Sequence, residues 1–439
     1  MVAGESRTPD RLTSRYRAAM RVLRVRGFTP LLVGQAVNET GNWIAVIAIW
    51  GFASFQFDVG AGDLALLFVV LSVPGALLGP LMGVPIDRLG PRRTLLIANL
   101  IGVVDALALT RADSYEMIIL LALPLGLIEA LAAASLDAIP PRLVPDDQLV
   151  TANALLGGAQ DLAIVVGPIA AAVVNAQWGL EGAFFADAAT FLVGAVVALQ
   201  LRVPGVPHDP AEHATSTWRE LRAGFTLARR TDGLRWTLAV ASCVYLLWAA
   251  FGVLEPLYVR DVLGGSEQMF ALLQTVFGVG LVLTGLSLAV VGERIARPRY
   301  VAIAMVVSGL TAALYLGTES KVVAFVGVFL WGVDTAFFYV PARTLLQRYA
   351  PTAFHGRVLS LNQSLEPAAG IVMSPLVALA LAVVSVQVLG ITAGAIATIG
   401  GLVLLRLSRG LGPPPPPVPL DPTAGTSRDA IALGGAAPG

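Results

Sequence analysis

The sequence predicts an all-α integral membrane protein that crosses the bilayer twelve times. Of its 439 residues, 56% are hydrophobic and only 13% are charged, whereas about 25% of an average soluble domain is charged. Apolar runs recur along almost the whole chain, and a run of roughly 20 residues spans a bilayer as a helix. Basic residues gather in every second connection between the runs, which is typical of loops on the cytoplasmic side.

The apolar runs form two sets of six. The first set is predicted at residues 28–53, 62–84, 94–110, 116–136, 151–175 and 182–202. The second set is predicted at residues 236–259, 268–291, 300–317, 321–342, 357–382 and 385–406. The sequence therefore predicts five parts, which are a basic cytoplasmic tail (1–27), a six-helix bundle (28–202), a cytoplasmic connector (203–235), a second six-helix bundle (236–409) and a disordered Pro/Gly/Ala-rich tail (410–439).

The distribution of basic residues predicts which side of the plasma membrane each connection faces. With the N-terminus in the cytoplasm, 26 of the 29 lysines and arginines lie on the cytoplasmic side. The three on the other side are Arg111, Arg260 and Lys321. One missed span would invert every later connection, so this asymmetry supports the count of spans and predicts that both termini are cytoplasmic.

The connection after the second run, residues 83–93, carries the most ordered charge pattern. Asp87 can pair with Arg88 or Arg92, or it can cap the helix that follows, whose N-terminus attracts a carboxylate. Pro91 suits the first turn of that helix. The same place in the second half holds Gly292–Arg297, with Ala296 where Asp87 stands. Two weakly similar halves predict a pair of bundles with a substrate path between them.

This connection resembles the loop motif G-x-x-x-D-R-x-G-x-R-x-x of the major facilitator superfamily. The matching residues are Gly83, Asp87, Arg88, Gly90 and Arg92, while Pro91 departs from the usual basic residue. The resemblance implies the major facilitator fold. It also implies that the loop is a gating latch, which holds the two halves closed on the cytoplasmic side and does not bind substrate.

Further segments resemble the enterobactin-exporter and macrolide-efflux branch of that family. These segments are residues 142–145, 152–155, 167–168 and 218–225. Gly158, Gly167 and Pro168 resemble the antiporter motif of the fifth span, although alanine replaces several of its glycines. Small residues also let helices approach closely whatever the function. The resemblance implies export, and these three residues are predicted to serve helix packing.

Acidic residues inside the apolar runs are the main functional candidates. A charge at the bilayer centre costs about 2.5–3.5 kcal/mol, so these side chains must face protein or water. No lysine or arginine is predicted deep in a run, which leaves protonation, a bound cation or polar neighbours. The deepest acids are Glu39, Glu129, Asp161, Asp334 and Glu366, with Asp105, Asp187 and Glu255 nearer the outer ends.

Helical spacing places several of these acids on polar faces. Gln35, Asn38, Glu39 and Asn42 lie on one face of the first run. The resemblance implies that the first, fourth, seventh and tenth spans line a central cavity. An acidic cavity suits protons and cationic or zwitterionic solutes, and tryptophan rings can stack on a bulky solute or attract its cation. The predicted substrate- and proton-binding residues are Asn38, Glu39, Glu129, Asp161, Trp248, Glu255, Trp331, Asp334 and Glu366. Each acid taken singly is equally well a hydrogen-bonded structural group.

These features predict a monomeric secondary transporter that exports a small amphiphilic molecule, such as a drug, a macrolide-like compound or a siderophore, by proton antiport with alternating access. No phosphate-binding loop is present, and with one cysteine and three histidines no metal site, cofactor or enzymatic activity is expected. The predicted partners are the solute, protons and the lipid bilayer, without nucleic acid. Two alternatives stay open, which are an importer or facilitator of a nutrient with the same fold, and a membrane sensor or scaffold that does not transport.

Overall fold

The chain is almost entirely helical. The computed structural model describes residues 19–78, 82–203, 222, 224–291, 295–351 and 354–412. Within these ranges, eight helices are long and apolar enough to cross a membrane, and twelve long helical segments are present when α8 is counted as two. Most of the two predicted tails and most of the predicted connector lie outside the described residues.

The first bundle consists of α2 to α8. Its long helices are α2 (Phe28–Gly51), α3 (Ala61–Leu78), α5 (Pro91–Leu109), α6 (Tyr115–Ala138) and α8 (Asp146–Gln200), with the short α4 (Gly83–Leu89) and α7 (Pro140–Leu143) between them. Gly179 divides α8, because its φ of 68° and ψ of −174° interrupt the helical backbone. That backbone conformation is open essentially to glycine alone, so this single residue separates the fifth span from the sixth.

The second bundle consists of α10 to α15. Its helices are α10 (Asp232–Leu257), α11 (Glu267–Val291), α12 (Pro298–Leu316), α13 (Lys321–Tyr349), α14 (His355–Leu381) and α15 (Val386–Leu407). Ser320 and Ser385 cap α13 and α15, since each hydroxyl accepts a hydrogen bond from a backbone N–H three residues later. Short π-helical segments, η1 (Phe52–Gln56) and η3 (Tyr258–Val262), extend α2 and α10, the first helix of each bundle.

The helix of the tenth predicted span extends beyond its apolar run. The apolar run ends at residue 342, but α13 continues to Tyr349. Hydropathy marks only the apolar part of a helix, whereas basic side chains such as Arg343 and Arg348 suit its C-terminal turns. Arg343 therefore belongs to a helix of the bundle and not to a loop.

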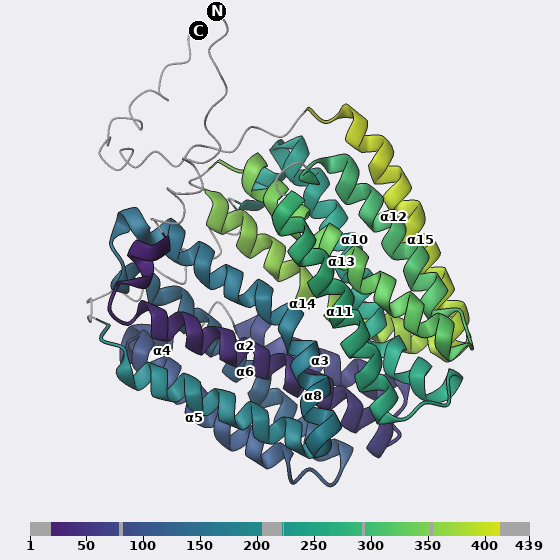
Figure 1. Cartoon of the computed structure of the whole chain (residues 1–439), viewed down its shortest axis with the longest axis horizontal. Helices are drawn as coiled ribbons and strands as arrows, with labels where there is room; N and C mark the ends of the chain where they lie inside the picture. The colour runs from purple at the N-terminus through teal and green to yellow at the C-terminus, as the bar shows by residue number, and fades with distance from the viewer. Residues whose placement is uncertain are drawn as a thin grey trace, which may run out of the picture.

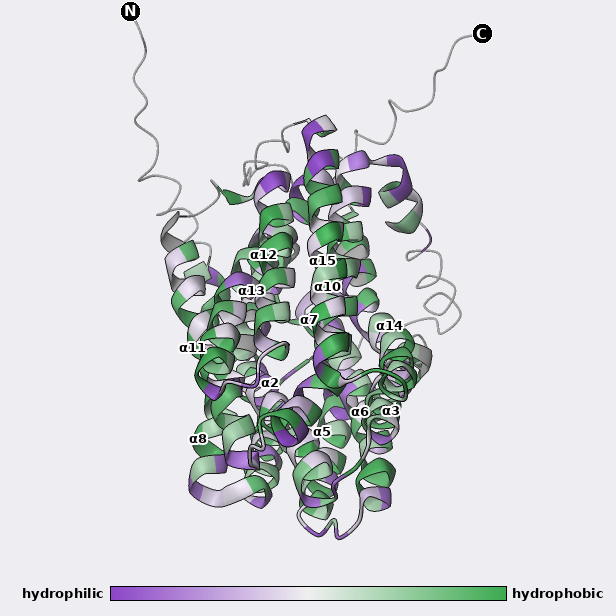
Figure 2. Cartoon of the chain, turned by 90° about the vertical axis from the view of Figure 1, so that its right-hand side faces the viewer, coloured by the Kyte–Doolittle hydropathy of each residue, from purple (hydrophilic) through white to green (hydrophobic). Residues whose placement is uncertain are grey.

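The two bundles lie side by side, with α2 to α8 in purple to teal and α10 to α15 in green to yellow (Figure 1). Across the interface, α3 packs against α14 and α8 packs against α11. Green, apolar residues predominate on the outer helices in Figure 2. Large exposed apolar side chains on the described helices include Leu120, Leu379 and Ile396. Apolar surface on this scale fits contact with lipid rather than with water.

The direction of α2 distinguishes the two ends of the molecule. The proximal end is the end at which α2 begins, and the distal end is the end at which α2 finishes. In the distal half, Phe68 of α3 lies against Gly252 of α10 and Gly370 of α14, and Ile169 of α8 lies against Gly278 of α11. The small glycine surfaces let the two bundles approach closely at this end.

Candidate functional site

The first bundle contributes a polar face centred on Glu39 of α2. Gln160 Nε2 of α8 donates a long hydrogen bond of 3.4 Å to Glu39 Oε1, and Glu129 of α6 is close enough to Glu39 to interact with it electrostatically. Asn38 Nδ2 and Asn42 Oδ1 are buried with no hydrogen-bond partner among the described residues. Because buried polar groups normally have partners, this face keeps hydrogen-bonding capacity for a solute or for water.

The second bundle contributes an aromatic wall from α10 and α13. The rings of Trp248 and Tyr339 are nearly parallel, with a 4° angle between their planes and centroids 6.3 Å apart. Tyr245 packs edge-on to Trp248 at 6.2 Å. The hydroxyl of Tyr245 accepts a 3.0 Å hydrogen bond from Asn362 Nδ2 of α14. The wall combines flat apolar surface with polar groups, since the buried Trp248 Nε1 has no partner within the described part of the chain.

Arg343 lies between these two faces, on a part of α13 that the sequence predicts as a cytoplasmic loop. A Cβ atom on Gly157 of α8 would stand 2.6 Å from Arg343 Nη2, so the guanidinium reaches across to the first bundle. Arg343 and Glu366 are also charged neighbours of Tyr245. The signal in the sequence is that Arg343 follows Tyr339 at the spacing of one helical turn, on the same face of α13. The site thus contains one base beside its acids.

Two of the predicted acids lie inside the second bundle, away from these faces. Asp334 is only 3% exposed, and it accepts hydrogen bonds from Ser308 Oγ at 3.1 Å and Thr311 Oγ1 at 2.7 Å. Glu255 accepts hydrogen bonds from the Tyr315 hydroxyl at 2.8 Å and Gln274 Nε2 at 3.0 Å. Both carboxyl groups therefore have hydrogen-bond partners within their own bundle. The role of Asp334 and Glu255 in substrate or proton binding stays a prediction.

Trp331 lies near Glu255 and not in the aromatic wall. Its ring packs against Phe251 at 4.1 Å, Phe277 at 5.2 Å and Tyr315 at 6.3 Å between centroids. Glu366 lies on α14 with an exposed side chain. Asp161 follows Gln160 on α8, and its side chain lies outside the described part of the structure.

The three residues of the predicted packing motif have different surroundings. Gly167 lies directly beneath the side chain of Trp43, which a Cβ atom at position 167 would overlap. Pro168 lies at the interface, with its Cβ 3.5 Å from the place of a Cβ on Gly278. Gly158 has open space around it. Close approach of helices therefore explains the first two positions and not the third.

The latch-like loop lies at the proximal end of α4 and α5. Gly83 begins α4, and Gly90 separates the two helices with a φ of 82°, a region that favours glycine. Pro91 is the first residue of α5, as predicted.

The predicted partners of Asp87 were wrong. Asp87 makes no side-chain cap to α5 and no ion pair with a described residue, and the neighbouring Arg88 is exposed. Arg92 instead donates hydrogen bonds to the carbonyl oxygens of Ala198 at 2.9 Å and Leu199 at 2.8 Å. These carbonyls belong to the last turn of α8, where carbonyl groups lack partners within the helix, so Arg92 caps the end of α8 instead of pairing with Asp87.

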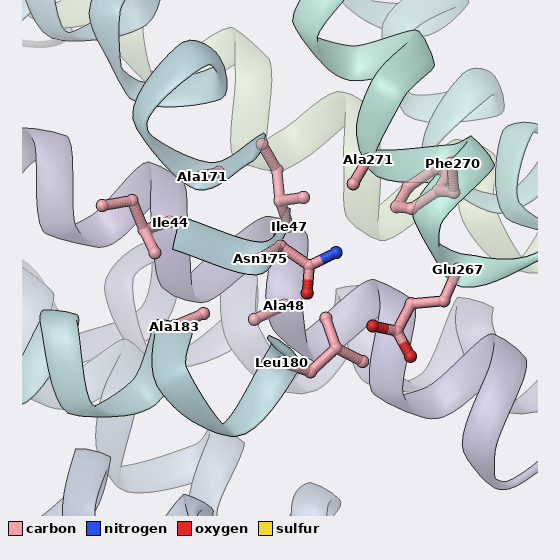
Figure 3. A pocket seen from close by; sticks show the side chains of 10 residues that line it. All are labelled: Ile44, Ile47, Ala48, Ala171, Asn175, Leu180, Ala183, Glu267, Phe270 and Ala271. Atoms are coloured by element: carbon pink, nitrogen blue, oxygen red, sulfur yellow. The ribbon is translucent and has the colours of Figure 1, made fainter. Parts of the chain in front are cut away.

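The distal end of the interface is closely packed. Figure 3 shows Asn175 of α8 and Glu267 of α11 pointing toward each other across it. Phe55 and Phe270 have ring centroids 5.8 Å apart across the same interface. The cavity between α2, α8 and α11 measures only about 10 Å³, which is at most the room for one water molecule. Among the described residues, no cluster of histidine, cysteine or acidic side chains has the arrangement of a metal site.

Comparisons with known proteins agree with this architecture. A model of the Major Facilitator Superfamily matches residues 31–264 and 237–434. Macrolide efflux protein A of Streptococcus pyogenes is 24% identical over 363 residues, which are 80% of this chain and 89% of that protein. Multidrug resistance protein MdtG of Klebsiella pneumoniae is 24% identical over 361 residues, which are 80% of this chain and 81% of that protein. A crystal structure of the peptide transporter POT in complex with sulfate has a similar fold, with a TM-score of 0.64 and 16% identity over 90% of this chain and 98% of that chain.

Proposed function

Because the chain belongs to the Major Facilitator Superfamily, we propose that this transporter exports a small amphiphilic molecule from the cytoplasm in exchange for protons. It is a multi-pass membrane protein and not an enzyme. The names of two relatives, a macrolide efflux protein and a multidrug resistance protein, support the direction of transport and the class of substrate.

The observation that carries the proposal is the pairing of a polar face with an aromatic wall across the interface. Gln160 lies one helical turn from Gly157, Arg343 Nη2 lies against Gly157, and Arg343 is a charged neighbour of Tyr245. The Glu39 face and the Trp248 wall therefore approach the same region from opposite bundles. A solute with a flat apolar body and a cationic group would find stacking surface on one side and carboxyl groups on the other.

Proton coupling is assigned to Glu39 and Glu129. The two carboxyl groups are close enough to interact electrostatically, and the hydrogen bond that Glu39 accepts from Gln160 is long. A carboxyl group that binds either a proton or a cationic solute, but not both, couples the inward movement of protons to the outward movement of the solute. Asp334 and Glu255 suit this role less well, because hydroxyl and amide groups of their own bundle already bind them.

The positions of the basic residues support a cytoplasmic proximal end. In that orientation the packed distal end separates the central site from the outside, which corresponds to one state of an alternating-access cycle. The loop that contains Asp87 and Arg88 lies at the proximal end, where it would act as the latch in the opposite state. One chain contains both faces of the site, which supports a monomer as the working unit.

Transport by purified protein in liposomes tests the proposal, with a radiolabelled macrolide and a cationic dye as probes. An imposed pH gradient is expected to drive accumulation by the unmodified protein. Glu39→Gln and Glu129→Gln are expected to abolish gradient-driven accumulation and to weaken exchange of labelled for unlabelled solute without abolishing it, because the aromatic wall still binds the apolar body of the solute. Glu116→Gln is the matched control, because Glu116 is an exposed acid at the start of the same helix as Glu129.

Three results would contradict the proposal in different ways. Retention of gradient-driven accumulation by both variants would remove Glu39 and Glu129 from the coupling mechanism. Exchange by the unmodified protein that ignores the pH gradient would indicate a facilitator. Failure to move either probe would exclude this class of substrate.

A further inference from the structure

Arg260 joins the two bundles at the distal end. It lies in η3, at the end of α10, and its Nη1 donates hydrogen bonds to the carbonyl oxygens of Ser54 at 3.0 Å and Val59 at 2.9 Å in the first bundle. Nη1 also lies 2.8 Å from Asp58 Oδ1. Arg260 Nε donates to Asp261 Oδ1 at 2.7 Å, which orients the guanidinium toward the first bundle.

The partners of Arg260 come from the corresponding segment of the other half. Both η1 and η3 are five-residue π-helical segments that follow the first long helix of a bundle. Ser54 and Arg260 are each the third residue of their segment. Equivalent positions of the two halves therefore meet at the distal end, as they do near the axis that relates two similar repeats, but only one of the two positions carries an arginine.

The irregular backbone of the first bundle makes these carbonyls available. Phe57 N donates to Phe52 O, and Val59 N donates to Ala53 O, which leaves the Ser54 carbonyl for the guanidinium. The turn that follows contains Asp58 with a φ of 50°, a conformation that aspartate tolerates better than most residues. A planar guanidinium with several fixed donors suits such a set of carbonyl and carboxylate acceptors.

The excess of basic residues on the cytoplasmic side does not explain the position of Arg260. It is one of three basic residues predicted on the outer side of the membrane, and its side chain is only 19% exposed. Separation of the bundles at this end would remove its partners from the first bundle. Loss of charge-assisted hydrogen bonds by a largely buried group is unfavourable, so these bonds favour the distal-closed conformation.

We propose that Arg260 is the distal gate of the transport cycle, and that its bonds to Ser54, Val59 and Asp58 break when the central site opens to the outside. This inference rests on the proposed alternating-access function. It adds a gating residue on the side opposite the latch-like loop, and it assigns the two π-helical segments as the surfaces that meet at the gate.

Distance measurements between spin labels test the gate without any substrate. The parent protein carries Cys243→Ser, which removes the single native cysteine, and labels at Glu181→Cys and Lys321→Cys, which are exposed positions at the distal ends of the two bundles. Arg260→Ala is expected to shift the main distance peak to a longer value. Asp58→Asn keeps both carbonyl acceptors and suits the left-handed turn, so a smaller shift is expected. Arg111→Ala is the control, because Arg111 is an exposed arginine at the same end.

The possible results distinguish failure of the gate proposal from failure of the proposed substrate class and from misfolding of a variant. Distance distributions of Arg260→Ala that equal those of the parent, in protein that remains monodisperse, would overturn the inference. An equal shift in Arg111→Ala would also overturn it, because the effect would then reflect loss of any distal charge. If Arg260→Ala does not fold, Arg260→Lys and Asp58→Asn supply the same test, and unchanged distances in both would reject the gate. A clear shift in protein that moves neither macrolide nor dye would keep the gate and reject the proposed substrate class.

Discussion

The side chain of Trp43 on α2 packs directly onto the backbone of Gly167 on α8. Any Cβ atom at position 167 would overlap the base of the indole. Trp43 lies one turn beyond Glu39 on α2, so this contact holds the acidic face of α2 against the fifth span. The glycine is required by the tryptophan, whatever the direction of transport.

Gly167→Ala is therefore expected to destabilise the protein by about 1–3 kcal/mol, the usual range for overpacking. Gly158→Ala is the matched control, because it lies on the same helix with nothing within 4 Å of its place for a Cβ. That control is expected to be neutral or slightly stabilising, since alanine favours a helix over glycine. Thermal unfolding in detergent measures both effects. Equal melting temperatures for the two variants would show that Trp43 moves aside at little cost.

Gly157 provides a second prediction, about movement of the bundles. Gly157→Ala is expected to be tolerated, since Arg343 Nη2 is the mobile end of a long side chain. Gly157→Trp is expected to prevent approach of the proximal halves, and so to stop transport while solute binding persists. Gly158→Trp, which places the same bulk one residue away in open space, is the control. Normal transport by Gly157→Trp would mean that α8 and α13 do not approach further during the cycle.

Asp334 tests whether burial within a bundle excludes a role in proton coupling. Asp334→Asn keeps an acceptor for Ser308 and Thr311, so we expect a loss of about 1 kcal/mol in the free energy of unfolding and retained gradient-driven transport. Asp334→Leu removes the acceptor of the buried Ser308 hydroxyl, while Thr311 keeps backbone acceptors in Val307 and Ser308, and it is expected to cost about 1–3 kcal/mol. Thermal unfolding and the liposome assay give the two readouts. If folded Asp334→Asn lost its response to the pH gradient, the original prediction of a proton-binding Asp334 would be supported.

Arg92 separates structural and gating roles within the latch-like loop. Arg92→Ala removes two hydrogen bonds to the end of α8 and is expected to lower stability by about 1–2 kcal/mol. Arg93→Ala should stay within about 0.5 kcal/mol of the parent, because Arg93 is exposed. Asp87→Asn is expected to change transport more than stability, since Asp87 has no ion-pair partner among the described residues. A melting temperature for Arg92→Ala equal to that of Arg93→Ala would contradict the capping role.

Part of the candidate site was predictable from helical spacing. The polar stripe that includes Asn38 and Glu39 does form one face of α2, because residues three and four apart lie on the same side of a helix. Arg343 was missed, because it follows the apolar run and hydropathy alone assigns it to a loop. Helical spacing and hydropathy also could not predict the hydrogen-bond partners of Asp334, because Ser308 and Thr311 lie on another helix.

The sequence by itself determined that the chain is a bundle of membrane-length helices in two halves, and which helices carry acids. Burial of about 20 consecutive apolar residues in lipid is a local property that any such run imposes. Only the tertiary structure decided which acids share the central region and which are enclosed within a bundle, because that depends on contacts between helices far apart in the chain. The same holds for Arg260, which in the sequence is an exception to the charge bias and in the fold is bound by carbonyls of the other bundle.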